Sequence, residues 1–70
     1  MNMIPVSSSN LSSVGYDPIT KTLFIRFVNG RTYSYSNVPE GIYCGLMQAD
    51  SKGKYHAAHI KYSYPYKQIF

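Results

Sequence analysis

Hydrophobic and polar residues alternate along the chain in two short runs, which lie on either side of Asn29-Gly30. Alternation over five or six residues is typical of a strand with one buried face. An Asn-Gly pair between two such runs is a strong hairpin signal, because both residues tolerate positive φ. The pattern therefore predicts a hairpin with strands at Thr22–Val28 and about Arg31–Asn37.

The length of the hairpin loop decides which way Tyr33 and Tyr35 point. With a two-residue loop, both tyrosines join Phe24 and Arg26 on an aromatic and basic face. With a bulge at Gly30 and a three-residue loop, they join the apolar face of the preceding strand. A shift of one residue moves every side chain to the other face. The helix that follows needs an apolar sheet face, which slightly favours the second register.

Segments on both sides of the hairpin extend this pattern. Weak alternation predicts a first strand at about Ser9–Tyr16, in which Gly15 marks a bulge or a close backbone approach. Pro39 and Glu40 are typical of a helix start, since proline suits the first helical position and an acid opposes the positive end of the helix dipole. We therefore expect a helix over Pro39–Ala49, with three antiparallel strands before it.

The second half of the chain predicts less regular structure. Gly45 lets the first helix approach the sheet, and Ser51 can cap a second, shorter helix at about Lys52–Ile60. Pro65 then predicts an extended tail or an edge segment. The expected fold is α+β: a three-stranded antiparallel β-meander packed by one α-helix, then a short second helix and an aromatic tail. The residues expected to form most of the core are Leu11, Val14, Leu23, Ile25, Phe27, Val38, Ile42, Leu46 and Ile60.

The chain of 70 residues is short enough to form a single domain over 1–70, with residues 1–6 expected to be a loose N-terminus. A domain of this size buries only roughly 60% of its unfolded surface. The one cysteine, Cys44, excludes an internal disulfide and suits a reducing compartment. The N-terminus lacks a basic and apolar leader pattern, and no apolar run approaches the roughly 18 residues of a membrane span. We expect a cytoplasmic protein with no membrane partner.

The net charge of +4 is concentrated in the last twenty residues. Three basic and three acidic side chains cancel in residues 1–50, whereas residues 51–70 carry four lysines and no acid. The same segment holds four of the eight tyrosines and both histidines. A basic, aromatic segment can attract phosphate groups and stack bases.

Catalytic and metal signatures do not stand out. His56 and His59 are three residues apart, but Cys44 and Asp50 are the only further ligands at hand, and their spacing matches no zinc finger. No two carboxylates are paired for acid–base work, and no glycine-rich phosphate loop is present. Cys44 has no activating neighbours and is expected to be a small packing residue. We expect no enzymatic activity, no metal site and no cofactor.

Several short motifs occur in a fixed order along the chain. These are SSNLSSVGYD, TLFIRF, NG, Tyr33-Ser34-Tyr35, Val38-Pro39, Ser51-Lys52-Gly53 and Tyr64-Pro65-Tyr66. In this order, over about Val6–Ile69, they resemble the KTSC domain. That family is named for the C-terminus of some lysyl-tRNA synthetases, and it also occurs as small stand-alone bacterial and phage proteins. The resemblance implies a small α/β module with RNA as partner, supplies no catalytic residues, and marks Tyr33 and Tyr35 as the family's hallmark.

Together these features predict a non-catalytic module that binds RNA or another single-stranded nucleic acid. Lysine and arginine would neutralise phosphates, and tyrosines would stack on bases for about 1–3 kcal/mol per base. The alternative is a protein-interaction module that uses a sheet edge or the tyrosine-rich tail, including self-association. A solvated basic end whose tyrosines pack on the sheet edge explains the same residues without a ligand. The candidate nucleic-acid-binding residues are Arg26, Arg31, Tyr33, Tyr35, Lys52, Lys54, Lys61, Tyr62, Tyr64 and Lys67.

Overall fold

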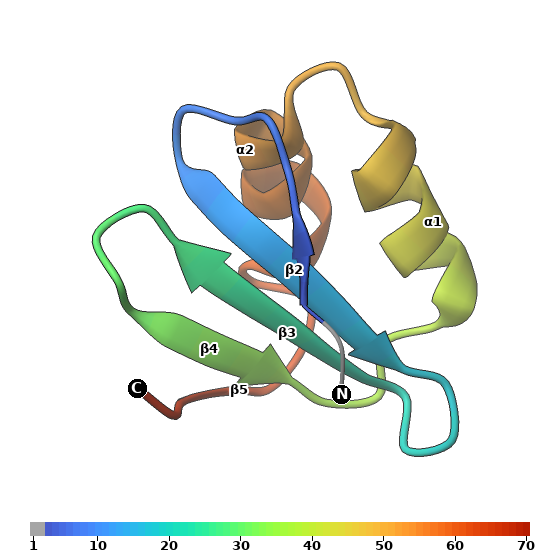
Figure 1. Cartoon of the computed structure of the whole chain (residues 1–70). Coiled ribbons are helices and arrows are strands. Elements are labelled where there is room, and N and C mark those ends of the chain that lie inside the picture. Colours follow the sequence, from blue (N-terminus) through green and yellow to red (C-terminus); the bar gives the residue numbers. More distant parts are fainter. Residues whose placement is uncertain (1–2) are drawn as a thin grey trace.

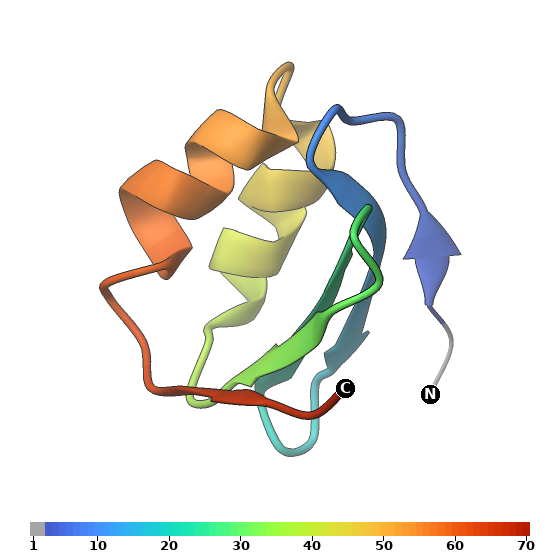
Figure 2. The same cartoon turned by 90° about the vertical axis from the view of Figure 1, so that its left-hand side faces the viewer.

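A five-stranded antiparallel sheet with all its helices on one face forms the protein (Figures 1 and 2). The computed structural model describes residues 3–70. The strands follow one another across the sheet in the order β1-β2-β3-β4-β5, and the helical segments lie between β4 and β5 in sequence. The strands are β1 (Ile4–Pro5), β2 (Leu11–Asp17), β3 (Thr22–Phe27), β4 (Thr32–Tyr35) and β5 (Tyr66–Gln68).

The helical layer consists of α1 (Glu40–Gln48), α2 (Lys52–Tyr55) and the π-helical turn η1 (His56–Ile60), which continues α2 without a break. The Ser51 side chain accepts the Lys54 N–H, so the predicted cap of the second helix is confirmed. At the other end, the Lys61 N–H donates to the His56 carbonyl at 2.9 Å, which is the five-residue spacing of a π-turn.

The hairpin between β3 and β4 adopts the register with the bulge. The Phe27 N–H donates to the Arg31 carbonyl at 2.8 Å, and Gly30 has a φ of 91°, so the loop has three residues. Leu23 therefore lies opposite Tyr35, and Ile25 lies opposite Tyr33. Both tyrosines consequently face the helices, as the second of the two predicted registers requires.

The core lies between the sheet and the helices. Two predicted core members, Phe27 and Ile42, are only half-buried and pack around it, because each lies near the end of its element. Tyr35 takes a place in the core instead, with 1% of its surface exposed. The buried hydrophobic residues that form the core are Leu11, Val14, Leu23, Ile25, Tyr35, Val38, Leu46 and Ile60.

The α+β class is confirmed, but the prediction of only three strands is wrong. The N-terminal segment and the tail each add a short edge strand, β1 and β5. Strands of two and three residues are too short to show an alternating pattern in the sequence. Pro5 also has no N–H to donate to a neighbouring strand, which argues against a strand at this position. Within the N-terminal segment 1–6 that was expected to be loose, Ile4–Pro5 pairs with β2, whereas residues 1–2 lie outside the described part of the chain.

The structure corrects two predictions about glycines, namely a bulge at Gly15 and an approach of Gly45 to the sheet. The register between β2 and β3 shifts between Leu11 and Ser13, so the bulge does not lie at Gly15, which is buried opposite Phe24. Gly45 allows a close approach, but the group that comes close is the Tyr55 ring of α2 and not the sheet.

Candidate nucleic-acid interface

A cleft of about 510 Å³ opens between the β3–β4 hairpin and the helical segment α2–η1. The hairpin contributes Phe27, Val28, Asn29 and Arg31, and β4 contributes Tyr33 and Tyr35. The opposite side contains Gly53, His56, Ala57 and Lys61, and Asn10, Tyr62 and Tyr66 complete the lining. Its volume lies within the roughly 300–1,000 Å³ that is usual for small-molecule sites.

A buried pair of polar side chains joins the two walls of the cleft. The Tyr35 hydroxyl and the Nε2 atom of His56 are 2.7 Å apart, and His56 is 8% exposed. The Phe27 ring meets the His56 ring edge-on, with centroids 5.3 Å apart. The bond between strand and helix therefore fixes the position of the η1 turn on the sheet.

Burial holds both members of this pair in their neutral forms. It lowers the pKa of His56 from its ordinary value of 6.5, and the positive charge of Lys61 adds to this effect. Burial, with the neighbouring Tyr33 and Tyr66 hydroxyls, raises the pKa of Tyr35 to about 12. The polar group at the base of the cleft is thus an uncharged hydrogen-bonding pair at neutral pH.

The lowered pKa of His56 makes the stability of the fold depend on pH. The unfolded chain binds a proton at His56 more readily than the folded chain, so stability is full above about pH 6.5 and falls as the pH drops through the folded pKa. We expect the urea concentration at the midpoint of unfolding to be lower at about pH 5 than at about pH 7.5. His56→Gln should lose most of this dependence, whereas His59→Gln, at an exposed site, should keep it. An unchanged slope in His56→Gln would contradict the assignment.

Aromatic rings form a connected group along the cleft. The rings of Tyr33 and Tyr66 are stacked, with centroids 5.7 Å apart and planes 13° apart. Phe27 meets Tyr33 edge-on at 5.6 Å. Tyr66 is 62% exposed, and the exposed Tyr62 ring has the Lys61 Nζ atom 5.3 Å from its centroid. The cleft therefore offers accessible ring surface beside a cation.

Five of the ten predicted binding residues line this cleft: Arg31, Tyr33, Tyr35, Lys61 and Tyr62. Tyr35 is the one among them that does not fit its predicted role, because a ring with 1% exposure cannot stack on a base. Its contribution is the hydrogen bond to His56.

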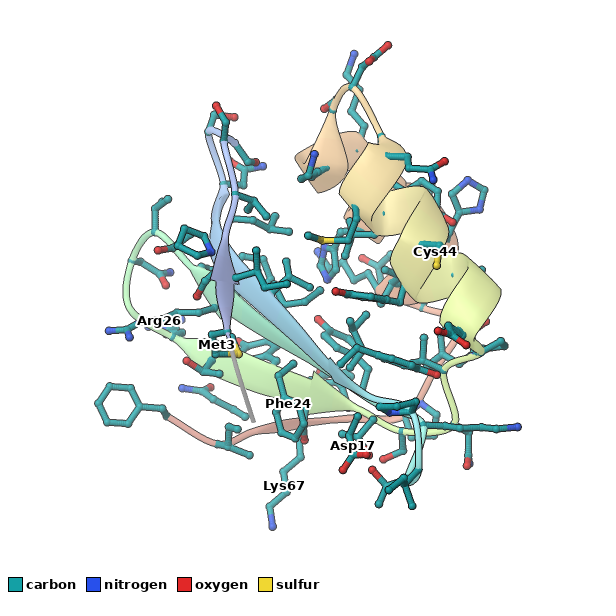
Figure 3. All side chains as sticks on the ribbon, turned by 45° about the vertical axis from the view of Figure 1, so that its right-hand side comes forward. Met3, Asp17, Phe24, Arg26, Cys44 and Lys67 are labelled. Carbon is teal, nitrogen blue, oxygen red and sulfur yellow. The ribbon has the colours of Figure 1, made fainter. Side chains whose placement is uncertain are left out.

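The other five predicted residues lie elsewhere. Arg26 and Lys67 are on the opposite face of the sheet, close to Phe24 (Figure 3). The Lys52 Nζ atom donates to the Ala49 carbonyl, and Lys54, in the same short helix α2, is exposed. Tyr64 is half-buried against the core. These side chains do not line the cleft because they lie on other faces of the sheet and of the helices. The distribution of charge along the sequence does not show on which face a side chain lies.

Sequence reasoning missed several lining residues, chiefly Asn10, Asn29 and Tyr66. Tyr66 alternates with Tyr62 and Tyr64 in the sequence, but its position beside Tyr33 depends on the pairing of β5 with β4. The sequence pattern explains Asn29 as a turn residue alone, and nothing in the sequence marks Asn10.

Other features of the described chain bear on the remaining expectations. Cys44 is exposed on α1, so it is not a packing residue (Figure 3). Within residues 3–70, no three side chains of His, Cys, Asp or Glu come together in a way that could hold a metal ion. No helix in the same part of the chain is long and apolar enough to cross a membrane.

Comparison with known proteins places this arrangement in a family. The KTSC domain family model matches residues 7–64. The crystal structure of a KTSC domain protein from Yersinia pestis is similar over 99% of this chain and 97% of that one, with a TM-score of 0.93 and 40% sequence identity.

Relatives in three further bacteria have similar sequences. A protein from Tsukamurella paurometabola is 42% identical over 53 residues, which cover 76% of this chain and 79% of the relative. An uncharacterized protein from Stutzerimonas stutzeri is 38% identical over 55 residues, or 79% of this chain and 78% of the relative. A lysine–tRNA ligase from Nostoc is 33% identical over 67 residues, which cover 96% of this chain but only 12% of that enzyme. The chain belongs to the KTSC domain family.

Proposed function

We propose that the protein binds single-stranded nucleic acid, and RNA in particular, at the cleft between the β3–β4 hairpin and η1. The observation that carries this proposal is the convergence of two exposed cations with aromatic rings. Arg31 comes from the hairpin and Lys61 from the end of η1, and the stacked rings of Tyr33 and Tyr66 lie along the same cleft. Proteins that bind single strands combine cations for the backbone with rings on which bases stack.

The charge balance of the cleft favours an anionic ligand. Within the described chain, its lining contains Arg31 and Lys61 but no carboxylate. Burial keeps His56 neutral at neutral pH, so it adds no charge. Two phosphate contacts to a single strand should give a slope of about −1.4 for the logarithm of the association constant against the logarithm of the salt concentration.

The relationship to a lysine–tRNA ligase supports RNA as the class of nucleic acid. A segment of that enzyme, named for tRNA, is 33% identical to almost the whole of this chain. Family analogy is a weaker argument for function than the site, so the cleft has to be tested directly.

The test is a titration of a fluorescently labelled, mixed-sequence single-stranded RNA, followed by anisotropy at about 50 and about 200 mM salt. We expect binding that weakens with salt. The double variant Arg31→Gln/Lys61→Gln should weaken binding by about tenfold or more and flatten the salt slope.

A matched control removes the same charge from the other face. The double variant Arg26→Gln/Lys67→Gln lowers the net charge equally, but its two side chains lie across the sheet from the cleft. Its affinity should stay close to that of the unchanged protein. Equal losses of affinity in both double variants would show that RNA binding depends on the net charge of the protein and not on the cleft. The absence of binding at low salt would refute the proposal.

A protein-interaction function is the second candidate, because apolar side chains are exposed at the β5 edge. Tyr66, Ile69 and Phe70 are 62%, 47% and 77% exposed, and β5 is the last strand of the sheet. A second chain could extend the sheet at this edge. Sedimentation at increasing protein concentration tests it, because self-association through this edge should persist at high salt.

A further inference from the structure

We infer that the cleft is a pocket for one unpaired ribonucleotide, whose base lies among the aromatic rings and whose phosphate lies between Arg31 and Lys61. This inference rests on the proposed function and specifies its ligand: the unit that binds is a nucleoside monophosphate, which the cleft should hold without a longer chain.

The size of the cleft is the first argument. Its volume of about 510 Å³ lies within the range of small-molecule sites, which suits a ligand of the size of a single nucleotide. The hairpin residues Phe27 to Asn29 bound one side, and α2 and η1 bound the other through Gly53, His56 and Ala57. A single base and its sugar phosphate suit an open cleft that is bounded on two sides in this way.

The chemistry of the lining is the second argument. The lining has an aromatic part and a cationic part, which correspond to the base and the phosphate of a nucleotide. Ring surface from Phe27, Tyr33 and Tyr66 suits the flat face of a base. The cations Arg31 and Lys61 suit a phosphate monoester, which carries about −1.5 to −2 charges at neutral pH. Arginine also offers paired donors to phosphate oxygens.

Two carboxamide side chains line the cleft and offer polar groups to the edge of a base. The Asn29 Oδ1 atom accepts the Arg31 N–H at 3.0 Å, which orients this side chain and leaves its amide group as a donor. Asn10 packs over Gly53, where an added Cβ would lie 2.8 Å from the Asn10 Nδ2 atom. The missing side chain of Gly53 thus makes room for Asn10 at the cleft, and carboxamides can pair with base edges through one donor and one acceptor.

The test is a titration of the full ¹⁵N-labelled chain with AMP, GMP, CMP and UMP, followed by two-dimensional NMR. At least one monophosphate should cause saturable shifts in the backbone amide signals of residues that line the cleft, including Asn10, Arg31 and Lys61. The double variant Arg31→Gln/Lys61→Gln should weaken this binding by about tenfold or more, and Arg26→Gln/Lys67→Gln should leave it unchanged.

Simpler ligands separate the contributions of base and phosphate. The matching ribonucleoside, which lacks the phosphate, and inorganic phosphate, which lacks the base, should each bind more weakly than the monophosphate. Tyr66→Leu, at an exposed site, should weaken monophosphate binding by about fivefold or more and leave inorganic phosphate unaffected. Inorganic phosphate that binds as well as the monophosphates would overturn the nucleotide pocket.

The outcomes also distinguish this inference from the proposed function. If the RNA strand binds with salt dependence but no monophosphate gives a saturable shift, the one-nucleotide pocket is wrong and strand binding stands. If the RNA strand and the monophosphates both fail to bind, the proposed function and the inference fall together. If a monophosphate shifts only signals on the outer face of the sheet, near Phe24, the cleft is not the site.

Discussion

Replacing Tyr35 with alanine is expected to lower the free energy of unfolding by about 3–5 kcal/mol. The ring is 1% exposed, and its hydroxyl is 2.7 Å from the Nε2 atom of the buried His56. Its loss leaves a large cavity beside an unpartnered polar group. A domain of 70 residues has a total stability of only roughly 4–10 kcal/mol, so much of the protein should unfold. Urea denaturation followed by circular dichroism measures the loss.

The matched control is Tyr33→Ala in the same strand. Tyr33 faces the same side of the sheet but is only half-buried, so its replacement should cost clearly less. Equal losses at the two positions would contradict the assignment of Tyr35 to the core and Tyr33 to the cleft.

A double-mutant cycle isolates the hydrogen bond from the packing. Tyr35→Phe keeps the ring and removes the hydroxyl, which leaves His56 without its partner at a cost of about 1–3 kcal/mol. His56→Leu in the same protein removes the orphaned group, so the double variant should cost less than the sum of the two single variants. Strict additivity would show that the pair contributes no coupling.

Replacing Gly45 with alanine is expected to destabilise the protein, even though alanine is the better helix former. A Cβ atom at this position would collide with the Tyr55 hydroxyl and ring, which pack against α1 from α2. Overpacking of this kind costs about 1–3 kcal/mol, which exceeds the gain of about 0.5–1 kcal/mol from replacing glycine in a helix. The midpoint of thermal unfolding should fall.

Gly41 provides a control of opposite sign in the same helix. Nothing lies within 4 Å of a Cβ added there, and its φ is not positive, so Gly41→Ala should leave the stability unchanged or raise it. In a Tyr55→Ala background the collision is absent, and Gly45→Ala should then be stabilising as well. A destabilising effect that persists in that background would mean that backbone conformation, and not the Tyr55 ring, requires glycine at position 45.

The Tyr33-Ser34-Tyr35 triplet shows how one motif serves two purposes. Both tyrosines point to the helical side of the sheet because side chains two residues apart share a face. Tyr35 lies under η1 and holds it through His56, whereas Tyr33 lies nearer the start of β4, where it lines the cleft and stacks with Tyr66. Since the spacing is equal for the two residues, the sequence could not separate the structural tyrosine from the candidate ligand contact.

Local chemistry determined the elements of this fold. The alternation in β3 and β4, the Asn29-Gly30 turn, the proline before α1, the glutamate at its start and the Ser51 cap each act over a few residues. They can therefore be recognised without knowing the rest of the structure. Seven of the eight buried core residues were predicted from the sequence, and those in β3 and α1 follow the periodicity, because burial follows the face of a strand or helix. The short strands β1 and β5 gave no such signal, since two or three residues show no period.

The sequence by itself determined the α+β class, the main hairpin and the concentration of charge in the last twenty residues. Only the tertiary structure decided which cations and rings share a surface. The three-residue loop of the hairpin sets the register that places Tyr33 and Tyr35 on the helical side of the sheet. The pairing of β5 with β4 brings Tyr66 to Tyr33. The π-turn places Lys61 beside the cleft, whereas Arg26 and Lys67 lie on the opposite face of the sheet. Side-chain direction follows from pairing partners far away in the chain, and a local pattern contains no information about those partners.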